Sequence, residues 1–585
     1  MEKMSLKAFW ETLEQRLAES SVEELRAILR AMAGQVAPGE RQGFVEKLQA
    51  PLPSSEPARQ SVGADLLDEI DDLVQDLEAE MQDAEYEVEE HGWDEYGEED
   101  ALGPYADFAE SFTALFGQAQ AAFESGDLVL ARDAFQKLFQ AQQIQDDYGR
   151  GVSANDLAID SAEQSARYLR AVYETAPAAE HPRVLFEQLR QVRVWIAALR
   201  PTLNDLIQIS VKPLPEYESF LPAWIAFLRT QNGPDADAWL REAIQLAQGT
   251  AGLEQLARME GAQRPRAYLD WFTALEKEER WLQVLDAARE ALTVLPAALP
   301  VRAAVADHWA RAAAQLGENE SLRAARWEAF QAQPTLARLL DLWDVAPAPD
   351  ERDVQMLRAA QALVAFLAKP PGHSGASLAA VSWEKDFLEQ PVWAHQSTLA
   401  HAYLLAGAWE QAHRLAASEK VLGWSSTEST QGLVLSIFLV LFSRRGMNEL
   451  PSNLTQLVTQ TLHNSVGYFP GMLTQTGTET LGTRLTRAYA ERFARAALSA
   501  AERETFRAWC LDVTQQRVNA IVSGQHRKSY DKAALLVAAC AEAFQLENPT
   551  EANALVNDVR QRFPRHSAFQ AELKTALHRA THTRR

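Results

Sequence analysis

One pattern recurs along this chain and constrains its fold more than any other: two helix-forming segments joined by a short turn. In FGQAQAAFESGDLVLARDAFQKLF, residues 116–139, the small residue Ala119 precedes a turn at Gly126, and Ala131 and Phe135 follow it. Glycine turns the chain because it adopts left-handed backbone angles at little cost. Alanine lets two helices approach closely, and phenylalanine fills the space to the next pair. The pattern predicts a helical hairpin.

The same order of residues returns three more times. In LAHAYLLAGAWEQAHRLA, Gly407 and Ala412 have the same spacing as Gly126 and Ala131. Weaker copies of the pattern begin at Tyr268 and His308. Their order resembles that of a tetratricopeptide repeat, which stacks helical hairpins. Spacing between the copies is irregular, and no run alternates in the manner of a strand. We therefore expect an all-α fold, a degenerate tetratricopeptide-like α-solenoid.

Longer stretches resemble a second family. ARYLRAVYETAPAAEHPRVLFEQL, RPRAYLDWFTALEKEERW and QHRKSYDKAALLVAACAEAF are similar to the helical region of bacterial proteins that carry a SWIM-type zinc finger. The resemblance extends over about 105–585 and implies a solenoid that binds partners. The finger itself requires a C-x-C…C-x-H arrangement. Because the chain has only Cys510 and Cys540, thirty residues apart, no zinc or nucleic-acid role carries over.

The rest of the chain divides by composition. Residues 1–48 are expected to form a small N-terminal helical module, and 49–104 a Pro/Ser linker followed by an acidic amphipathic arm. The solenoid would then occupy 105–585, with a basic part from about 480. The apolar run 432–442 is too short to span a bilayer and is expected to be a buried helix, so we expect no membrane contact. Few cysteines and no signal peptide indicate the cytoplasm.

The net charge of −25 is concentrated in one window. Between Gln60 and Ala131 the sequence has 22 Asp and Glu and no Lys or Arg. Within it, ADLLDEIDDLVQDLEAEMQ carries an apolar stripe on one face of a predicted helix and carboxylates on the other. YEVEEHGWDEYGEED, residues 86–100, follows with eight carboxylates and three aromatic Tyr and Trp residues.

Two interpretations of this window stay open. It is either a solubilising, partly disordered spacer or a docking element for a basic protein surface, since carboxylates steer association. Imitation of nucleic-acid charge, and a cover for the chain's own basic end, are further alternatives. Under the docking interpretation, apolar and aromatic side chains make the partner contacts. The candidate partner-binding residues are Leu66, Ile70, Leu73, Leu77, Tyr86, Trp93 and Tyr96.

The C-terminal stretch 480–585 is basic, with 17 Lys and Arg against 10 Asp and Glu. Its candidate basic patch consists of Arg484, Arg487, Arg492, Arg495, Arg527 and Lys528. A solvated helix face explains such residues without a ligand. Nucleic-acid binding is the alternative, although the overall acidity and the scarcity of interleaved aromatic residues argue against it.

Signatures of catalysis and cofactor binding are missing from the sequence. No phosphate loop, dinucleotide fingerprint, zinc-protease motif or nucleophile elbow occurs. His395, His401 and His413 are six and twelve residues apart, which does not suit metal ligands on helices. We predict no catalytic, cofactor or metal site. The sequence favours a non-catalytic cytoplasmic scaffold or adaptor for protein partners, with a nucleic-acid-associated protein as the alternative, and leaves the oligomeric state open.

Overall fold

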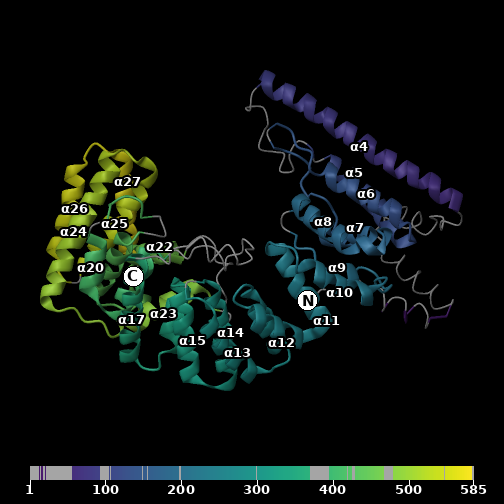
Figure 1. Cartoon of the computed structure of the whole chain (residues 1–585). Coiled ribbons are helices and arrows are strands. Elements are labelled where there is room, and N and C mark those ends of the chain that lie inside the picture. Colours follow the sequence, from purple (N-terminus) through teal and green to yellow (C-terminus); the bar gives the residue numbers. More distant parts are fainter. Residues whose placement is uncertain are drawn as a thin grey trace. The chain divides into compact units, whose positions relative to one another are not determined.

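A computed structural model describes residues 56–91, 105–368, 394–466 and 479–582, except for 106, 148, 155, 197–198, 298, 418, 425–428 and 546, together with isolated positions between 12 and 21. These residues form 23 α-helices and no strand (Figure 1). The prediction of an all-α fold is therefore confirmed for the described part of the chain. They fall into two compact units, residues 1–252 and 253–585. The predicted N-terminal module lies almost wholly outside the described residues.

The N-terminal unit is built from consecutive helices that pack on their neighbours in the sequence. The long helix α4 lies along the α5–α6 pair, as Figure 1 shows. The helices of this unit are α4 (Glu56–His91), α5 (Phe108–Ser125), α6 (Leu128–Ala141), α7 (Ser161–Thr175), α8 (His181–Trp195), α9 (Leu203–Gln208), α10 (Tyr217–Leu228) and the first part of α11 (Pro234–Glu260).

The C-terminal unit begins with the same consecutive packing and ends in a cluster around one large core. Its helices are α12 (Arg266–Lys277), α13 (Trp281–Val294), α14 (Val301–Leu316), α15 (Asn319–Ala332), α16 (Leu336–Val345), α17 (Pro349–Ala368), α19 (Gln396–Ala406), α20 (Trp409–Ala417), α21 (Gln431–Ser443), α22 (Ser452–Val466), α23 (Leu481–Phe493), α24 (Ala500–Ser523), α25 (Tyr530–Phe544), α26 (Pro549–Arg562) and α27 (Ser567–His582).

All four predicted hairpins are present, as α5–α6, α12–α13, α14–α15 and α19–α20. Gly126, Gly317 and Gly407 each end a first helix in the left-handed region, with φ of 89°, 72° and 71°. Ala131 and Ala412 are fully buried where the sequence places them against the partner helix. The structure therefore shows adjacent helical hairpins, and it leaves the repeat type as a prediction.

The apolar run 432–442 forms α21, and every residue of this helix is buried. It packs against α19, α20, α22, α24 and α25, which explains why it has no polar face. The prediction of a buried helix is confirmed. Among the described residues, no helix has both the length and the apolarity that a membrane span requires.

Two boundaries differ from those expected. Helix α4 begins at Glu56, inside the segment predicted as a linker, and continues to His91, inside the acidic segment 86–100. The expected single array from residue 105 contains the division between the two units, which falls within α11. That helix is broken at Gly249, whose φ of 61° and ψ of −150° are not helical.

Three of the described helices receive an N-terminal cap from a glutamate on another segment, because their first N–H groups have no partner within the helix. Glu242 accepts from the N–H groups of Leu203 and Asn204 at the start of α9. Glu419 does the same at α21, where it accepts from Thr430 and Gln431. Each cap thus fixes a helix end and the spacing between two segments.

The third of these glutamates is Glu542 of α25. It accepts from the backbone N–H of Leu454 at 2.9 Å and from the side chain of Asn453 at 2.7 Å, at the start of α22. The side chain of Asn453 also donates to the Ala576 carbonyl on α27, so three helices meet at this point.

Candidate functional site

The apolar stripe of α4 packs onto the chain itself. Its side chains have period 3.6 spacing, lie against α5 and α6, and are 8% exposed or less: Leu66, Ile70, Leu73, Leu77 and Met81. Lys137 of α6 adds an ion pair, with its Nζ 2.5 and 2.6 Å from the two carboxylate oxygens of Asp71. A partner could reach this stripe only if α4 separated from α5 and α6. In this structure the candidate partner-binding residues Leu66, Ile70, Leu73 and Leu77 hold α4 against α5 and α6.

The exposed surface of α4 around this stripe carries a run of carboxylates, of which Asp71 pairs with Lys137 of α6 and Glu69 accepts from the side chain of Gln118 of α5. Between residues 65 and 80 every acidic side chain is exposed: Asp65, Asp68, Glu69, Asp71, Asp72, Asp76, Glu78 and Glu80. At 1.5 Å per residue this row extends over about 23 Å of helix. The repulsion among them is offset by burial of the stripe, because an isolated helix with this charge pattern would be destabilised. We call these eight residues the acidic face.

The three aromatic candidates are placed differently. Tyr86 lies within α4, in the part of the helix whose side chains are not described. Trp93 and Tyr96 lie outside the described residues. Their predicted partner contacts therefore stay predictions.

The predicted basic patch is a set of ion pairs within the C-terminal unit. Arg484 of α23 lies 2.7 Å from Asp341 and 2.8 Å from Asp344, both on α16. Although burial opposes its charge, these carboxylates hold the pKa of Arg484 above its usual value. Arg487 pairs with Asp344 and Glu479, each at 3.2 Å. These two arginines join α23 to α16.

The C-terminal end of α23 and the residues just after it are held in the same way. Arg492 and Arg495 share one carboxylate, that of Asp353 on α17, at 2.9 and 3.0 Å. The Arg492 guanidinium also lies over the Trp409 ring, 5.2 Å from its centroid. It passes so close to Gly407 that a β-carbon there would overlap it. Glycine at this turn therefore serves both the backbone angle and the passage of Arg492.

These contacts correct the expectation of a solvated basic face. The three arginines of α23 and Arg495, just beyond its end, bind carboxylates that lie about 140 residues earlier in the sequence, so their charges are largely offset. Arg527 and Lys528 are exposed, in a short 3₁₀ turn before α25. Three of the six candidate cations of the nucleic-acid alternative thus lie on exposed surface, and one of them, Arg487, is already paired with carboxylates.

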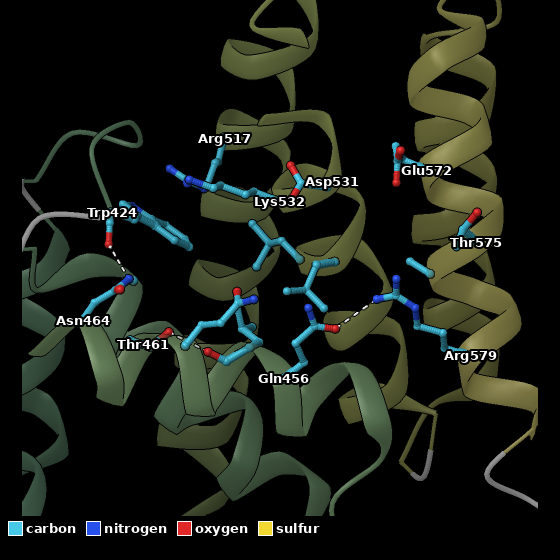
Figure 2. A pocket seen from close by; sticks show the side chains of 16 residues that line it. Trp424, Gln456, Thr461, Asn464, Arg517, Asp531, Lys532, Glu572, Thr575 and Arg579 are labelled. Carbon is cyan, nitrogen blue, oxygen red and sulfur yellow. Dashed lines mark hydrogen bonds between the residues drawn. The ribbon is translucent and has the colours of Figure 1, made fainter. Parts of the chain in front are cut away.

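A polar cleft in the C-terminal unit was not anticipated from the sequence. Its volume is about 260 Å³, and Trp424 and residues of α21, α22, α24, α25 and α27 line it (Figure 2). Figure 2 shows Arg517, Trp424 and Asn464 gathered at one end and Glu572, Thr575 and Arg579 of α27 at the other. The spacing of Gln456, Gln460 and Asn464 along α22 is the one local signal, since positions i, i+4 and i+8 share a helix face.

The cysteines and histidines form no shared centre in the described ranges, where no group of three or more His, Cys, Asp or Glu could hold a metal ion. Cys510 and Cys540 are free, buried thiols in α24 and α25. Burial raises the pKa of Cys540 to about 12. His401 is fully buried in α19, and its Nδ1 lies 2.7 Å from the Tyr489 hydroxyl.

His401 should make stability depend on pH. Burial lowers its pKa to about 3, against about 6.5 in an unfolded chain. The unfolded state therefore binds the proton first, and stability falls as pH drops below about 6.5. Between pH 7 and pH 5, protonation of this residue in the unfolded chain alone should lower the free energy of unfolding by about 2 kcal/mol. Urea unfolding of wild type and His401→Asn at both pH values measures it: the variant should lose that part of the pH dependence, and equal dependence would contradict the assignment.

Comparison with known proteins gives no family. No family model matches the chain, and a search of curated proteins finds no match. The resemblances to tetratricopeptide repeats and to the helical region of SWIM-finger proteins therefore stay predictions. The arrangement of the helices and the charges on their surfaces remain as the guide to function.

Proposed function

We propose that this protein is a non-catalytic scaffold or adaptor that binds a protein with a basic surface through the acidic face of α4. The eight exposed carboxylates, fixed on one helix by a buried stripe, are the observation that carries the proposal. Rows of like charge raise the rate of encounter with an oppositely charged partner and suppress wrong ones. The adjacent helical hairpins would supply further contact surface. We also propose a cytoplasmic location, because both cysteines are buried free thiols.

The experiment removes negative charge from α4 and leaves its buried apolar stripe unchanged. We would compare full-length wild type with a variant in which four exposed acids of α4 become amides: Asp65→Asn, Asp68→Asn, Asp72→Asn and Asp76→Asn. Proteins captured from a lysate of the native host would be quantified by mass spectrometry at low and high salt. We expect a partner with a basic surface whose capture weakens with salt and is lost in the variant.

A control variant carries the same charge change elsewhere. It neutralises four exposed acids dispersed over the C-terminal unit: Asp286→Asn, Glu318→Gln, Glu320→Gln and Glu410→Gln. It should retain the partner, because dispersed charges do not form a contact row. Equal capture by wild type and the α4 variant would contradict the proposal, and so would equal losses in both variants.

A further inference from the structure

The polar cleft contains a buried cation that differs from the other buried arginines. Seven arginines of the described residues are buried, and six of them pair with a carboxylate. The pairs are Arg167–Glu163, Arg170–Glu174, Arg241–Asp237, Arg338–Asp307, Arg484–Asp341 and Arg492–Asp353. The seventh, Arg517 of α24, has no ion pair in the described part of the chain. Buried charges are normally paired, because an unpaired one is costly.

The contacts of Arg517 leave part of its guanidinium available. One nitrogen donates to the Val421 carbonyl, and the group lies over the Trp424 ring, 4.0 Å from its centroid. Gly432 makes room for that ring, since a β-carbon there would lie 2.9 Å from it. Burial lowers the pKa of Arg517 to about 10, so it stays charged at neutral pH. Arg517 lines the cleft, and a guanidinium has five N–H donors, more than this one carbonyl contact uses.

The other lining groups suit a polar ligand with an anionic end. Gln456, Gln460 and Asn464 present amide groups, which both donate and accept hydrogen bonds. Lys532 and Arg579 add positive charge at the rim, while Asp531 and Glu572 add negative charge. A volume of about 260 Å³ is below the usual range for drug-sized ligands, so the cleft suits a small molecule or one side chain of a larger one.

We propose that this cleft binds a small oxyanion group, a carboxylate or a phosphate, with Arg517 as its buried cation and the amides of α22 holding the polar remainder. A hydrogen bond to a charged group is stronger than one between neutral groups, and it is stronger still where the charged group is buried, as Arg517 is. This site is separate from the acidic face of α4, and it does not depend on the scaffold proposal.

Titration calorimetry on the full chain tests the site with two probes, inorganic phosphate and N-acetylglutamate, at constant ionic strength. We expect saturable binding of one probe, and the preferred probe identifies the source of the oxyanion. Arg517→Met should weaken binding at least about tenfold, because hydrogen bonds to charged groups are worth that much. Arg414→Met, which removes an exposed arginine of α20, should leave it unchanged.

Two outcomes would overturn the proposal: no saturable heat from either probe with wild type, or equal affinity in wild type and Arg517→Met. If Arg517 only anchors the Val421–Trp424 segment, its variant loses stability and the probes do not bind wild type. Should Arg517→Met fail to fold, Gln460→Ala and Asn464→Ala take its place, since these side chains are exposed and half-buried. Each should weaken binding several-fold, and wild-type affinity in both would equally overturn the site.

Discussion

Replacing Asp353 by alanine is expected to destabilise the C-terminal unit by about 3 kcal/mol, because removing one partner of a buried ion pair leaves the other charge uncompensated. Asp353 is the carboxylate partner of both Arg492 and Arg495. The Arg492 side chain is only 10% exposed, so water cannot replace the lost contact. Urea unfolding, followed by circular dichroism, measures the change in free energy.

Two further variants make this result specific. Glu479→Gln removes a partner of the 42%-exposed Arg487 and should cost less than about 1 kcal/mol, as exposed pairs do. Adding Arg492→Met to Asp353→Ala should recover part of the loss, because an apolar side chain replaces the stranded charge. If Asp353→Ala lowered the free energy of unfolding no more than Glu479→Gln does, the ion pairs of Asp353 would not contribute to the stability of the C-terminal unit.

Replacing Leu77 or Ile70 by alanine should release α4 from the N-terminal unit. Both side chains are fully buried, and truncating such a residue costs about 2 to 5 kcal/mol. Because α4 packs mainly on α5 and α6 among the described helices, we expect the loss to appear as local opening of α4. Hydrogen exchange by mass spectrometry should show α4 amides exchanging at least about thirtyfold faster, which corresponds to 2 kcal/mol.

Gln75→Ala is the matched control, because this residue lies on the same helix and is exposed. It should leave the exchange of α4 unchanged. If Leu77→Ala also lost the basic partner, the acidic face would bind that partner only while α4 is packed on α5 and α6. Unchanged exchange in Leu77→Ala would instead mean that the stripe does not hold the helix.

The hairpins could be predicted from the sequence because their determinants are local. Gly126 and Gly407 are the left-handed ends of helices, and Ala131 and Ala412 contact helices only a few residues away. The buried position of α21 followed from its composition for the same reason. Such features need no knowledge of distant segments.

The partners of the charged and apolar faces could not be predicted, because they depend on segments far apart in the sequence. Arg484 meets Asp344 across 140 residues, and periodicity alone indicated a solvated face. The apolar stripe of α4 indicated that another part of the protein or a partner must cover it. The sequence pattern did not identify α5 and α6 as the helices that do so. The cleft draws on Trp424 and on five helices, α21, α22, α24, α25 and α27, between residues 424 and 579, and only the amide spacing on α22 could be recognised in the sequence.

The glutamate caps have a consequence for how the chain is made. Glu542 is added to the growing polypeptide 88 residues after Leu454, whose N–H it accepts. At about 5 to 20 residues per second, that interval is roughly 4 to 18 s. During this time the residues at the start of α22 have been synthesised, but Glu542, which accepts from their N–H groups, has not. The last helices of the C-terminal unit therefore complete an element translated well before them, so assembly of this unit cannot finish strictly in the order of synthesis.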